Sequence, residues 1–262
     1  MTIVEKPTLT RAAVVEAAAR IAPHVRRTPT ERSPALSQLA GREVYLKLEN
    51  LQRTGAFKIR GALNALTRLD AAKRAAGVVT ASAGNHGQGV AFAAQLIGVP
   101  ATVVLPQGVP LTKLTQVQRS GAETVLADGD YDEAHAVALE IARERGRTYV
   151  HAFDDDDVIA GQGTVALEML EDADELDTLV VPVGGGGLIA GIALSASERK
   201  PRVRIASASI VERRSCAYVS SARAGKRISP TSSEVARRYS WREKCFSISF
   251  MNASDAWTPG GS

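Results

Sequence analysis

The stretch LKLENLQRTGAFKIRG, residues 46–61, joins the end of a strand to the start of a helix. Its alternating first residues predict a strand, residues 50–55 predict a turn, and Lys58 opens a helical pattern. A lysine in this position lies at the positive end of the helix macrodipole beside Phe57, and both the dipole and burial disfavour its ammonium form. Schiff-base lysines are made reactive in this way. Lys58 is thus a candidate nucleophile, and a solvated lysine on an amphipathic helix is the alternative that the other motifs must exclude.

Length and composition are those of an α/β protein with an ample core. The 262 residues can hold one large α/β domain or two smaller ones. No apolar run reaches membrane-spanning length, and the polar N-terminus has no signal-peptide h-region. Two cysteines, Cys216 and Cys245, argue against a disulfide scaffold and favour a reducing compartment. We therefore expect a cytoplasmic protein with no membrane partner.

The formal net charge of +4 is concentrated in the last part of the sequence. Residues 1–204 carry 23 Lys and Arg against 24 Asp and Glu, whereas residues 205–262 carry 9 against 4. A basic segment can bind nucleic acid, but here the basic residues are sparse and form no recognition motif. Nucleic acid is therefore not an expected partner.

Apolar periodicity predicts alternating strands and helices up to about residue 205. The predicted strands are 43–49, 77–80, 101–105, 123–127, 148–151, 178–183 and a strand that begins at 203. The predicted helices are 10–21, 34–39, 58–75, 88–97, 112–120, 131–145, 159–170 and 188–198. This alternation indicates an α/β fold with a parallel sheet covered by helices on both faces. The short strands between Gly77 and Leu126 are suited to a smaller sheet domain inserted in a larger one.

The pattern changes after about Ile205. Serine occurs 13 times in residues 205–262 and only 6 times in residues 1–204, and the apolar periodicity fades. Such Arg- and Ser-rich sequence is typical of disorder or of a change of reading frame in the gene. We favour the frame change, and a regulatory or interaction tail is the alternative.

Two loops between a predicted strand and a predicted helix are suited to binding anions. Ser82-Ala83-Gly84-Asn85-His86-Gly87 presents backbone N–H groups, a hydroxyl and an amide at a helix N-terminus, which suits a carboxylate or a phosphate. Gly184–Gly187 lets the backbone approach an anion closely, and its spacing matches neither a dinucleotide fingerprint nor a P-loop. An imine-forming lysine, a carboxylate loop and a phosphate cradle together indicate pyridoxal phosphate bound to Lys58. No metal site is expected, and the acidic run at residues 154–157 is interpreted as a solvated loop.

Four segments carry a family resemblance: KLENLQRTGAFKIRGALNAL, VVTASAGNHGQGVAFAA, HAFDDDDVIAGQGT and VVPVGGGGLIAGIA. Over about residues 10–205 the chain closely resembles the serine/threonine dehydratases (threonine ammonia-lyases), which are pyridoxal-phosphate enzymes of the tryptophan-synthase-β-like fold type II. The resemblance implies a large domain formed by residues 1–52 and 150–205 and a small inserted domain, residues 53–149. Residues 206–262 would be an atypical tail.

The resemblance also implies roles for individual residues. Lys58 would hold the cofactor through an imine and then remove the Cα proton of the substrate, with Phe57 packed beside the ring. The phosphate would be held by the glycine loop and the next amide: Gly184, Gly185, Gly186, Gly187 and Leu188. The substrate carboxylate would be lined by a second set, of which Asn85 also faces the ring oxygen: Ser82, Ala83, Gly84, Asn85 and His86.

The implied reaction is the β-elimination of water from L-threonine or L-serine, giving 2-oxobutanoate or pyruvate and ammonia. Serine racemases of this family carry a serine at the position of Ala83, and because alanine cannot move a proton, a dehydratase is favoured over a racemase. Another hydroxy-amino-acid dehydratase and a non-catalytic binding module are the alternatives. The family also implies a homo-oligomer.

The chain departs from the family pattern in four places. Ala56 and Ala152 replace the usual serine and proline. No segment matches the one that supplies a Ser, Thr or Cys to the pyridine nitrogen, and Ser209 stands about where some members carry a cation-binding carboxylate. We therefore expect poor stability and little activity.

Overall fold

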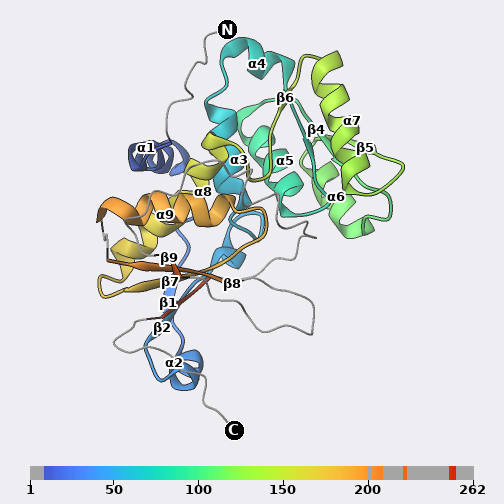
Figure 1. The fold of residues 1–262 in the computed structure, drawn as a ribbon. Coiled ribbons are helices and arrows are strands. Elements are labelled where there is room, and N and C mark those ends of the chain that lie inside the picture. Colours follow the sequence, from blue (N-terminus) through green and yellow to red (C-terminus); the bar gives the residue numbers. More distant parts are fainter. Residues whose placement is uncertain (1–8, 200–201, 209–220, 223–247, 252–262) are drawn as a thin grey trace.

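The computed structural model describes residues 9–199, 202–208, 221–222 and 248–251. Its two sheets lie apart, with helices packed between and around them (Figure 1). A six-stranded sheet has the order β1-β2-β10-β7-β8-β9, and a four-stranded sheet has the order β5-β4-β3-β6. The strands are β1 (Thr30–Arg32), β2 (Val44–Lys47), β3 (Val78–Ala81), β4 (Ala101–Leu105), β5 (Glu123–Leu126), β6 (Thr148–Tyr149), β7 (Thr178–Pro182), β8 (Arg204–Ala208), β9 (Ser221–Ala222) and β10 (Ile248–Met251).

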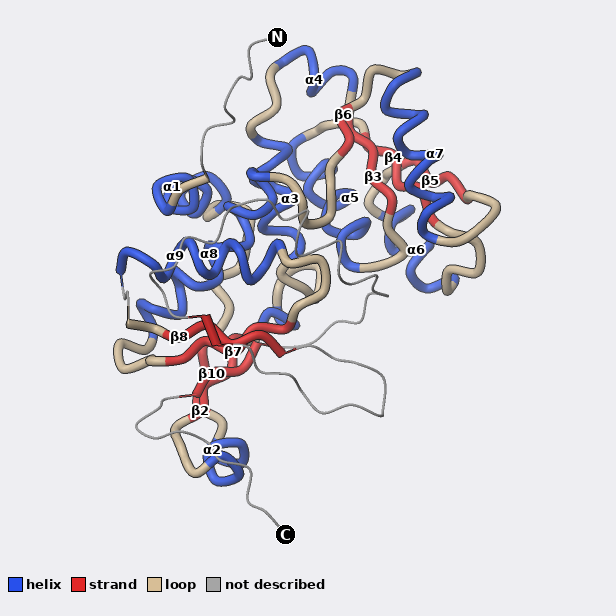
Figure 2. The backbone as a smooth tube through the Cα atoms, in the orientation of Figure 1, coloured by secondary structure: helices blue, strands red, loops and turns tan. Residues whose placement is uncertain are grey.

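Helices alternate with these strands along most of the described chain, as Figure 2 shows. They are α1 (Arg11–Ile21), α2 (Pro34–Ala40), α3 (Lys58–Thr67), α4 (Ala71–Ala76), α5 (Asn85–Ile97), α6 (Leu111–Arg119), α7 (Tyr131–Glu144), α8 (Asp156–Asp172) and α9 (Gly187–Arg199), with the short 3-10 helix η1 (Glu49–Leu51). The prediction of an α/β fold with helices on both sides of parallel strands is therefore confirmed.

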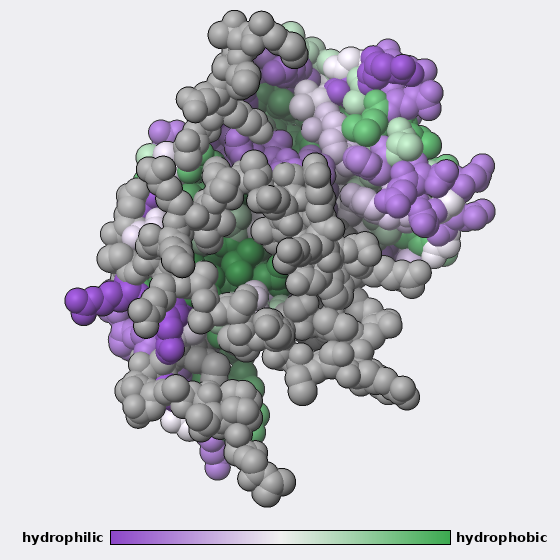
Figure 3. All heavy atoms as spheres, in the orientation of Figure 1, coloured by the Kyte–Doolittle hydropathy of each residue, from purple (hydrophilic) through white to green (hydrophobic). Residues whose placement is uncertain are grey.

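The four-stranded sheet is parallel throughout and is covered on both faces. Val78 of β3 belongs to the apolar cluster that includes α5, whereas its neighbour Val79 belongs to the cluster that includes α7. Successive side chains of a strand point to opposite faces, so both faces need apolar residues. This is why every residue of β3 and β4 is buried. The outer side of α7 carries charged residues, and the hydrophilic surface there is visible in Figure 3.

The six-stranded sheet is mixed. β7 and β8 are parallel, β1 and β2 are antiparallel, and β10 lies between β2 and β7, antiparallel to both. Two short strands of this sheet, β9 and β10, come from the segment after residue 205, in which the sequence predicted no strand–helix unit. Apart from residues 206–208, which belong to β8, the rest of that segment lies outside the described residues, and with it the predictions of a frame change or disorder and of a missing pyridine partner.

Helix α8 lies against α1, α3 and α9 and forms the centre of the helical layer over the large sheet (Figure 1). Glycines allow these close contacts, because any side chain would strike a neighbouring backbone. A Cβ atom at Gly161 would lie 2.5 Å from the carbonyl oxygen of Arg60, and one at Gly163 would lie 2.6 Å from that of Gly191. The backbones of α3 and α9 therefore pack directly on α8.

Three boundaries differ from the prediction in ways that matter for the site. The predicted helix 58–75 is divided into α3 and α4, because the Asp70 carboxylate caps a new helix by accepting a hydrogen bond from Lys73 N at 2.8 Å. α5 begins at Asn85, three residues earlier than predicted, so the asparagine loop contributes its first turn. The acidic run is not a solvated loop: Asp155 caps α8, and the following two aspartates occupy its first turn.

Candidate functional site

Lys58 is the first residue of α3, as the sequence predicted. The residue before it, Phe57, makes no side-chain capping bond, and the Lys58 ammonium group lies 5.6 Å from the centre of the Phe57 ring. Lys58 Nζ donates a hydrogen bond to the carbonyl oxygen of Ala152 at 3.0 Å. The half-buried amine is therefore held at a helix N-terminus against the chain that follows β6.

The asparagine loop runs from the end of β3 into α5. Ser82 is buried, and its hydroxyl accepts a hydrogen bond from Gly84 N at 3.1 Å. The first N–H groups of a helix have no acceptor within the helix, so the N-terminus of α5 carries a partial positive charge. α5 also lies close to Lys58, because a Cβ atom at Gly89 would lie 3.1 Å from Lys58 C. The loop predicted to bind a carboxylate thus borders the helix that begins at Lys58.

His86 is one of the residues expected to line the substrate carboxylate, and its side chain is buried. The ring is 0% exposed, and Nε2 lies 3.1 Å from the carbonyl oxygen of Val150. Burial, followed by the positive charge of Lys58, lowers the pKa of His86 to about 3. The imidazole is therefore neutral near pH 7 and connects α5 to the end of β6, and only the backbone N–H of His86 remains a candidate ligand for a carboxylate.

The glycine loop lies between β7 and α9, with Gly187 as the first residue of the helix. Phe153 fills the space beside it. A Cβ atom at Gly185 would overlap the Phe153 ring, and one at Gly187 would lie 2.9 Å from the Phe153 carbonyl oxygen. Gly186 has φ +89°, a conformation that favours glycine. The loop is thus wrapped closely around Phe153, with its helix N-terminus available to an anion.

Replacing Gly185 by alanine is expected to destabilise the cofactor-free chain by roughly 1–3 kcal/mol, because the new methyl group overlaps the Phe153 ring. Gly184→Ala is the matched control: it adds the same methyl group in the same loop, where no atom lies within 4 Å, at a φ outside the left-handed region. Urea unfolding measures both variants. Equal losses of stability in the two would contradict the role given to Phe153.

Residues 150–153 join these three features, which are far apart in the sequence. The carbonyl of Val150 contacts His86, the carbonyl of Ala152 accepts from Lys58, and Phe153 supports the glycine loop. The sequence pattern HAFD was noted only as part of a family resemblance, and no role was predicted for Phe153 or His151. Their part in the site depends on contacts between distant segments, which no local pattern carries.

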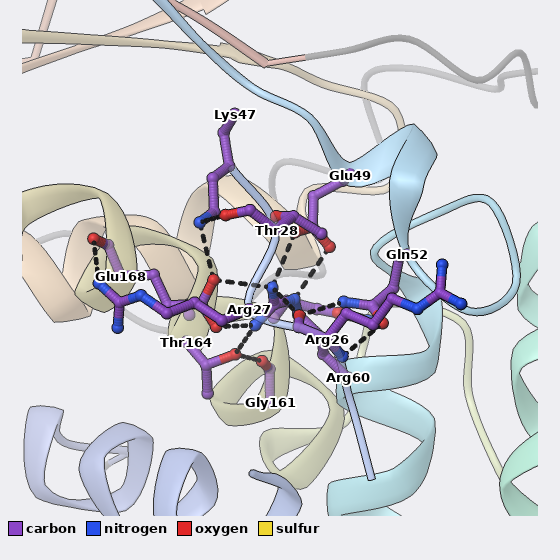
Figure 4. Close-up of polar contacts among 12 residues, drawn as sticks. Arg26, Arg27, Thr28, Lys47, Glu49, Gln52, Arg60, Gly161, Thr164 and Glu168 are labelled. Atoms are coloured by element: carbon purple, nitrogen blue, oxygen red, sulfur yellow. Dashed lines mark hydrogen bonds and ion pairs between the residues drawn. The ribbon is translucent and has the colours of Figure 1, made fainter. Parts of the chain in front are cut away.

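A buried ionic cluster lies on the other side of α3 (Figure 4). Arg60, which is 0% exposed, donates two hydrogen bonds to Glu49 at 2.8 and 2.9 Å and two to Glu168 of α8 at 2.6 and 3.0 Å. Lys47 of β2 is also 0% exposed and lies 2.7 Å from Glu168. Thr28 completes the cluster by donating to Glu49 and accepting from Lys47.

This ionic cluster fixes the helix that begins at Lys58. Burial acts to lower the pKa of Arg60, but the charge and hydrogen bonds of Glu49 and Glu168 outweigh it and leave the pKa raised, so the guanidinium stays charged. Its carboxylate partners come from η1 and α8, and it also donates a hydrogen bond to the Arg26 carbonyl oxygen, so the side chain ties α3 to three other segments. Sequence analysis assigned no role to Arg60, since an arginine two residues after Lys58 looks like a solvated helix residue until its partners are placed around it.

The part of the chain that the structure describes contains no group of three or more His, Cys, Asp or Glu residues placed to hold a metal ion. Within the same residues, none of the helices combines the length and the apolar character needed to cross a membrane.

Comparisons with known proteins identify relatives of this chain. A profile of the family described as pyridoxal-phosphate dependent enzyme matches residues 21–248, and so extends beyond the limit of about 205 that the motifs indicated. The L-threonine ammonia-lyase of Thermotoga maritima is 50% identical over 181 residues, which cover 69% of this chain and 45% of that protein. The serine racemase of Arabidopsis thaliana is 43% identical over 195 residues, covering 74% of this chain and 59% of that protein.

Among solved structures, the serine racemase of maize matches with a TM-score of 0.74 and 41% identity, over 76% of this chain and 60% of that one. The chain spans about half the length of the curated relatives it matches. The profile covers most of the chain, and the relatives match it at high identity. The chain therefore belongs to the pyridoxal-phosphate-dependent enzymes of fold type II.

Proposed function

We propose that this chain derives from an L-threonine or L-serine dehydratase, which eliminates water to give 2-oxobutanoate or pyruvate and ammonia. The observation that carries the proposal is the position of the Lys58 amine at a helix N-terminus, where it donates a hydrogen bond to the Ala152 carbonyl. The residue after Ala152 is Phe153, whose side chain supports the glycine loop. The relatives named L-threonine ammonia-lyase support the choice of substrate.

The residues present fit the family's cofactor. A Cβ atom at Gly185 has no room beside Phe153, and Gly186 adopts a left-handed conformation, so the loop is constrained to present its backbone rather than side chains. Gly184–Gly187 and the Leu188 amide would hold the phosphate, Phe57 would pack beside the ring, and Asn85 would face the ring oxygen. When bound, pyridoxal phosphate supplies an electron sink for the electron pair left at Cα.

The chain's own residues would bind the substrate and move its proton. The first turn of α5, with Ser82 and Gly84 before it, would bind the substrate carboxylate by donating hydrogen bonds from its N–H groups. The Lys58 amine would take the proton from Cα, after which the Cβ–O bond breaks and the hydroxyl group leaves as water, with one proton gained to balance the one removed from Cα. Hydrolysis of the resulting enamine consumes one water molecule and releases ammonia, so the net products are the 2-oxo acid and ammonia.

Ala83 favours elimination over racemisation. Serine racemases also occur among the relatives, so reaction type is not fixed by family membership. A racemase needs a second acid/base on the opposite side of the cofactor, where the family resemblance places Ala83, and a methyl group cannot donate a proton.

The purified chain is incubated with pyridoxal phosphate, reduced with borohydride and digested, and its peptides are analysed by mass spectrometry. The expected result is a pyridoxyl group on Lys58. A panel of L-threonine, L-serine and other hydroxy amino acids is then assayed for 2-oxo acid and for the D-enantiomer. Formation of D-serine without 2-oxo acid would contradict elimination, and a folded chain that takes up no cofactor would favour a binding module. We expect weak turnover by this chain, because residues 206–262 contain no segment that would supply a Ser, Thr or Cys to the pyridine nitrogen of the cofactor.

A further inference from the structure

His151 makes an unusual pair of contacts with the backbone of the next residues. Its Nδ1 atom accepts a hydrogen bond from Asp154 N at 2.8 Å and another from Phe153 N at 3.3 Å. An imidazole nitrogen can accept only when it carries no proton. The geometry therefore selects the neutral ring with its hydrogen on Nε2.

The turn held by this ring is the same one that supports the candidate site. The Phe153 ring packs edge-on against His151, with ring centroids 4.6 Å apart, and fills the space beneath Gly185. Ala152, within the same turn, accepts the hydrogen bond from Lys58. A change at His151 would thus reach both the glycine loop and the lysine without touching either directly.

We propose that His151 is a positioning residue. Its neutral imidazole fixes the turn at residues 152–154 and thereby holds the glycine loop and the Lys58 amine in the positions that cofactor binding requires. This inference deepens the proposed function and rests on it for the identity of the cofactor. Protonation of Nδ1 would remove both acceptor bonds and leave two backbone N–H groups facing a cation.

The groups around His151 determine the pH at which its Nδ1 atom is protonated. Burial lowers the pKa of His151, and so do His135 of α7 and Lys58, whereas Asp154 and Asp155 raise it. Tyr149 faces the ring from β6 at a centroid distance of 6.1 Å and is neutral, because burial raises its pKa. His86 of α5 is neutral near pH 7.

The sign of the pH effect follows from the lowered pKa. A histidine whose pKa is lower in the folded than in the unfolded chain stabilises the fold at pH values above its ordinary pKa, which is near 6.5. That contribution is lost as the pH falls from this value through the lower value of the folded state. The turn, and cofactor binding with it, should therefore weaken on the acid side.

The first experiment uses the full chain without cofactor. Nitrogen-15 NMR of the imidazole is expected to give an unprotonated, hydrogen-bonded Nδ1 near pH 7 and a His151 pKa below the ordinary value. The protection of the Phe153 and Asp154 amides against exchange, relative to the intrinsic exchange rate at each pH, should fall as His151 is protonated. A protonated Nδ1 near pH 7, or protection of these amides that does not follow the His151 titration, would overturn the proposal even if the chain never bound pyridoxal phosphate.

The second experiment measures the dissociation constant of pyridoxal phosphate for three variants. His151→Ala should raise it about tenfold or more, since two hydrogen bonds are lost. His151→Asn places an amide oxygen where Nδ1 was and cannot titrate, so it should stay within about threefold of the parent near pH 7 and lose part of the parent's weakening between about pH 7 and pH 5. His135→Asn is the matched control, because His135 stands in the same ring cluster without bonding to the turn, and it should keep the parent's dissociation constant near pH 7.

Two results of that experiment would refute the positioning role. One is an asparagine variant as weak in cofactor binding as the alanine variant. The other is an acid-side loss of affinity that is identical in the parent and in His151→Asn.

Discussion

Replacing Lys58 by alanine is expected to abolish both the covalent attachment of pyridoxal phosphate and the release of 2-oxo acid. The amine is the group that would form the imine and take the Cα proton, and positioned proton transfer alone typically contributes about 10²–10⁴-fold to a rate. The combined loss should therefore be at least about 10³-fold in kcat. Absorbance of the bound cofactor and mass spectrometry after borohydride reduction measure the first effect, and a coupled assay for 2-oxo acid measures the second.

The fold should tolerate this change. Lys58 Nζ makes a hydrogen bond to the Ala152 carbonyl and lies half-buried at a helix start, where alanine is also acceptable. Lys73→Ala is the matched control, because Lys73 is also a helical lysine, in the next helix α4, and its side chain is 61% exposed. Retention of the reduced cofactor adduct in Lys58→Ala, or its loss in Lys73→Ala, would show that another lysine carries the cofactor.

Replacing Arg60 by methionine is expected to lower the free energy of unfolding by about 3–5 kcal/mol. Arg60 is fully buried between Glu49 and Glu168, and its removal leaves the Glu49 carboxylate, only 4% exposed at its side chain, without a cation (Figure 4). An unpaired buried charge is costly because it has lost its hydration and its counter-charge together. Methionine keeps most of the volume, so the effect measured by urea unfolding reports the charge rather than a cavity.

Arg32 supplies the control for this experiment. It forms a bidentate pair with Glu43, but both side chains are about half exposed, and exposed pairs contribute little. Arg32→Met should therefore leave the unfolding midpoint unchanged within error. If Arg60→Met behaved like Arg32→Met, the ionic cluster could not be what fixes α3 on α8.

The Arg60 variant should also weaken cofactor binding, because α3 carries Lys58 two residues before Arg60. This second effect separates a helix that is merely less stable from one that is misplaced. At a temperature where the variant is fully folded, a dissociation constant for pyridoxal phosphate equal to that of the parent would restrict the cluster to a role in stability.

Local patterns were sufficient to predict most of the elements. The strand at 101–105 and the helix ends at Ile21 and Ile97 follow from periodicity and from the glycine or proline beside them. The errors occur where one side chain overrides periodicity, as with the cap at Asp70 that divides the helix predicted at 58–75. The acidic run was misjudged for the same reason, since Asp155 is a helix cap and its neighbours are first-turn residues.

The sequence by itself determined the α/β class, the family and the three segments that carry the candidate chemistry: the lysine at a helix start, the asparagine loop and the glycine loop. These are local features, because backbone freedom and helix polarity depend on a few consecutive residues. Only the tertiary structure decided that Phe153 and His151 support the glycine loop, that the His86 ring is buried away from solvent, and that Arg60 is a buried cation between two carboxylates. Burial and pairing depend on segments up to about a hundred residues away, and the charge state and position of a side chain depend on burial and pairing.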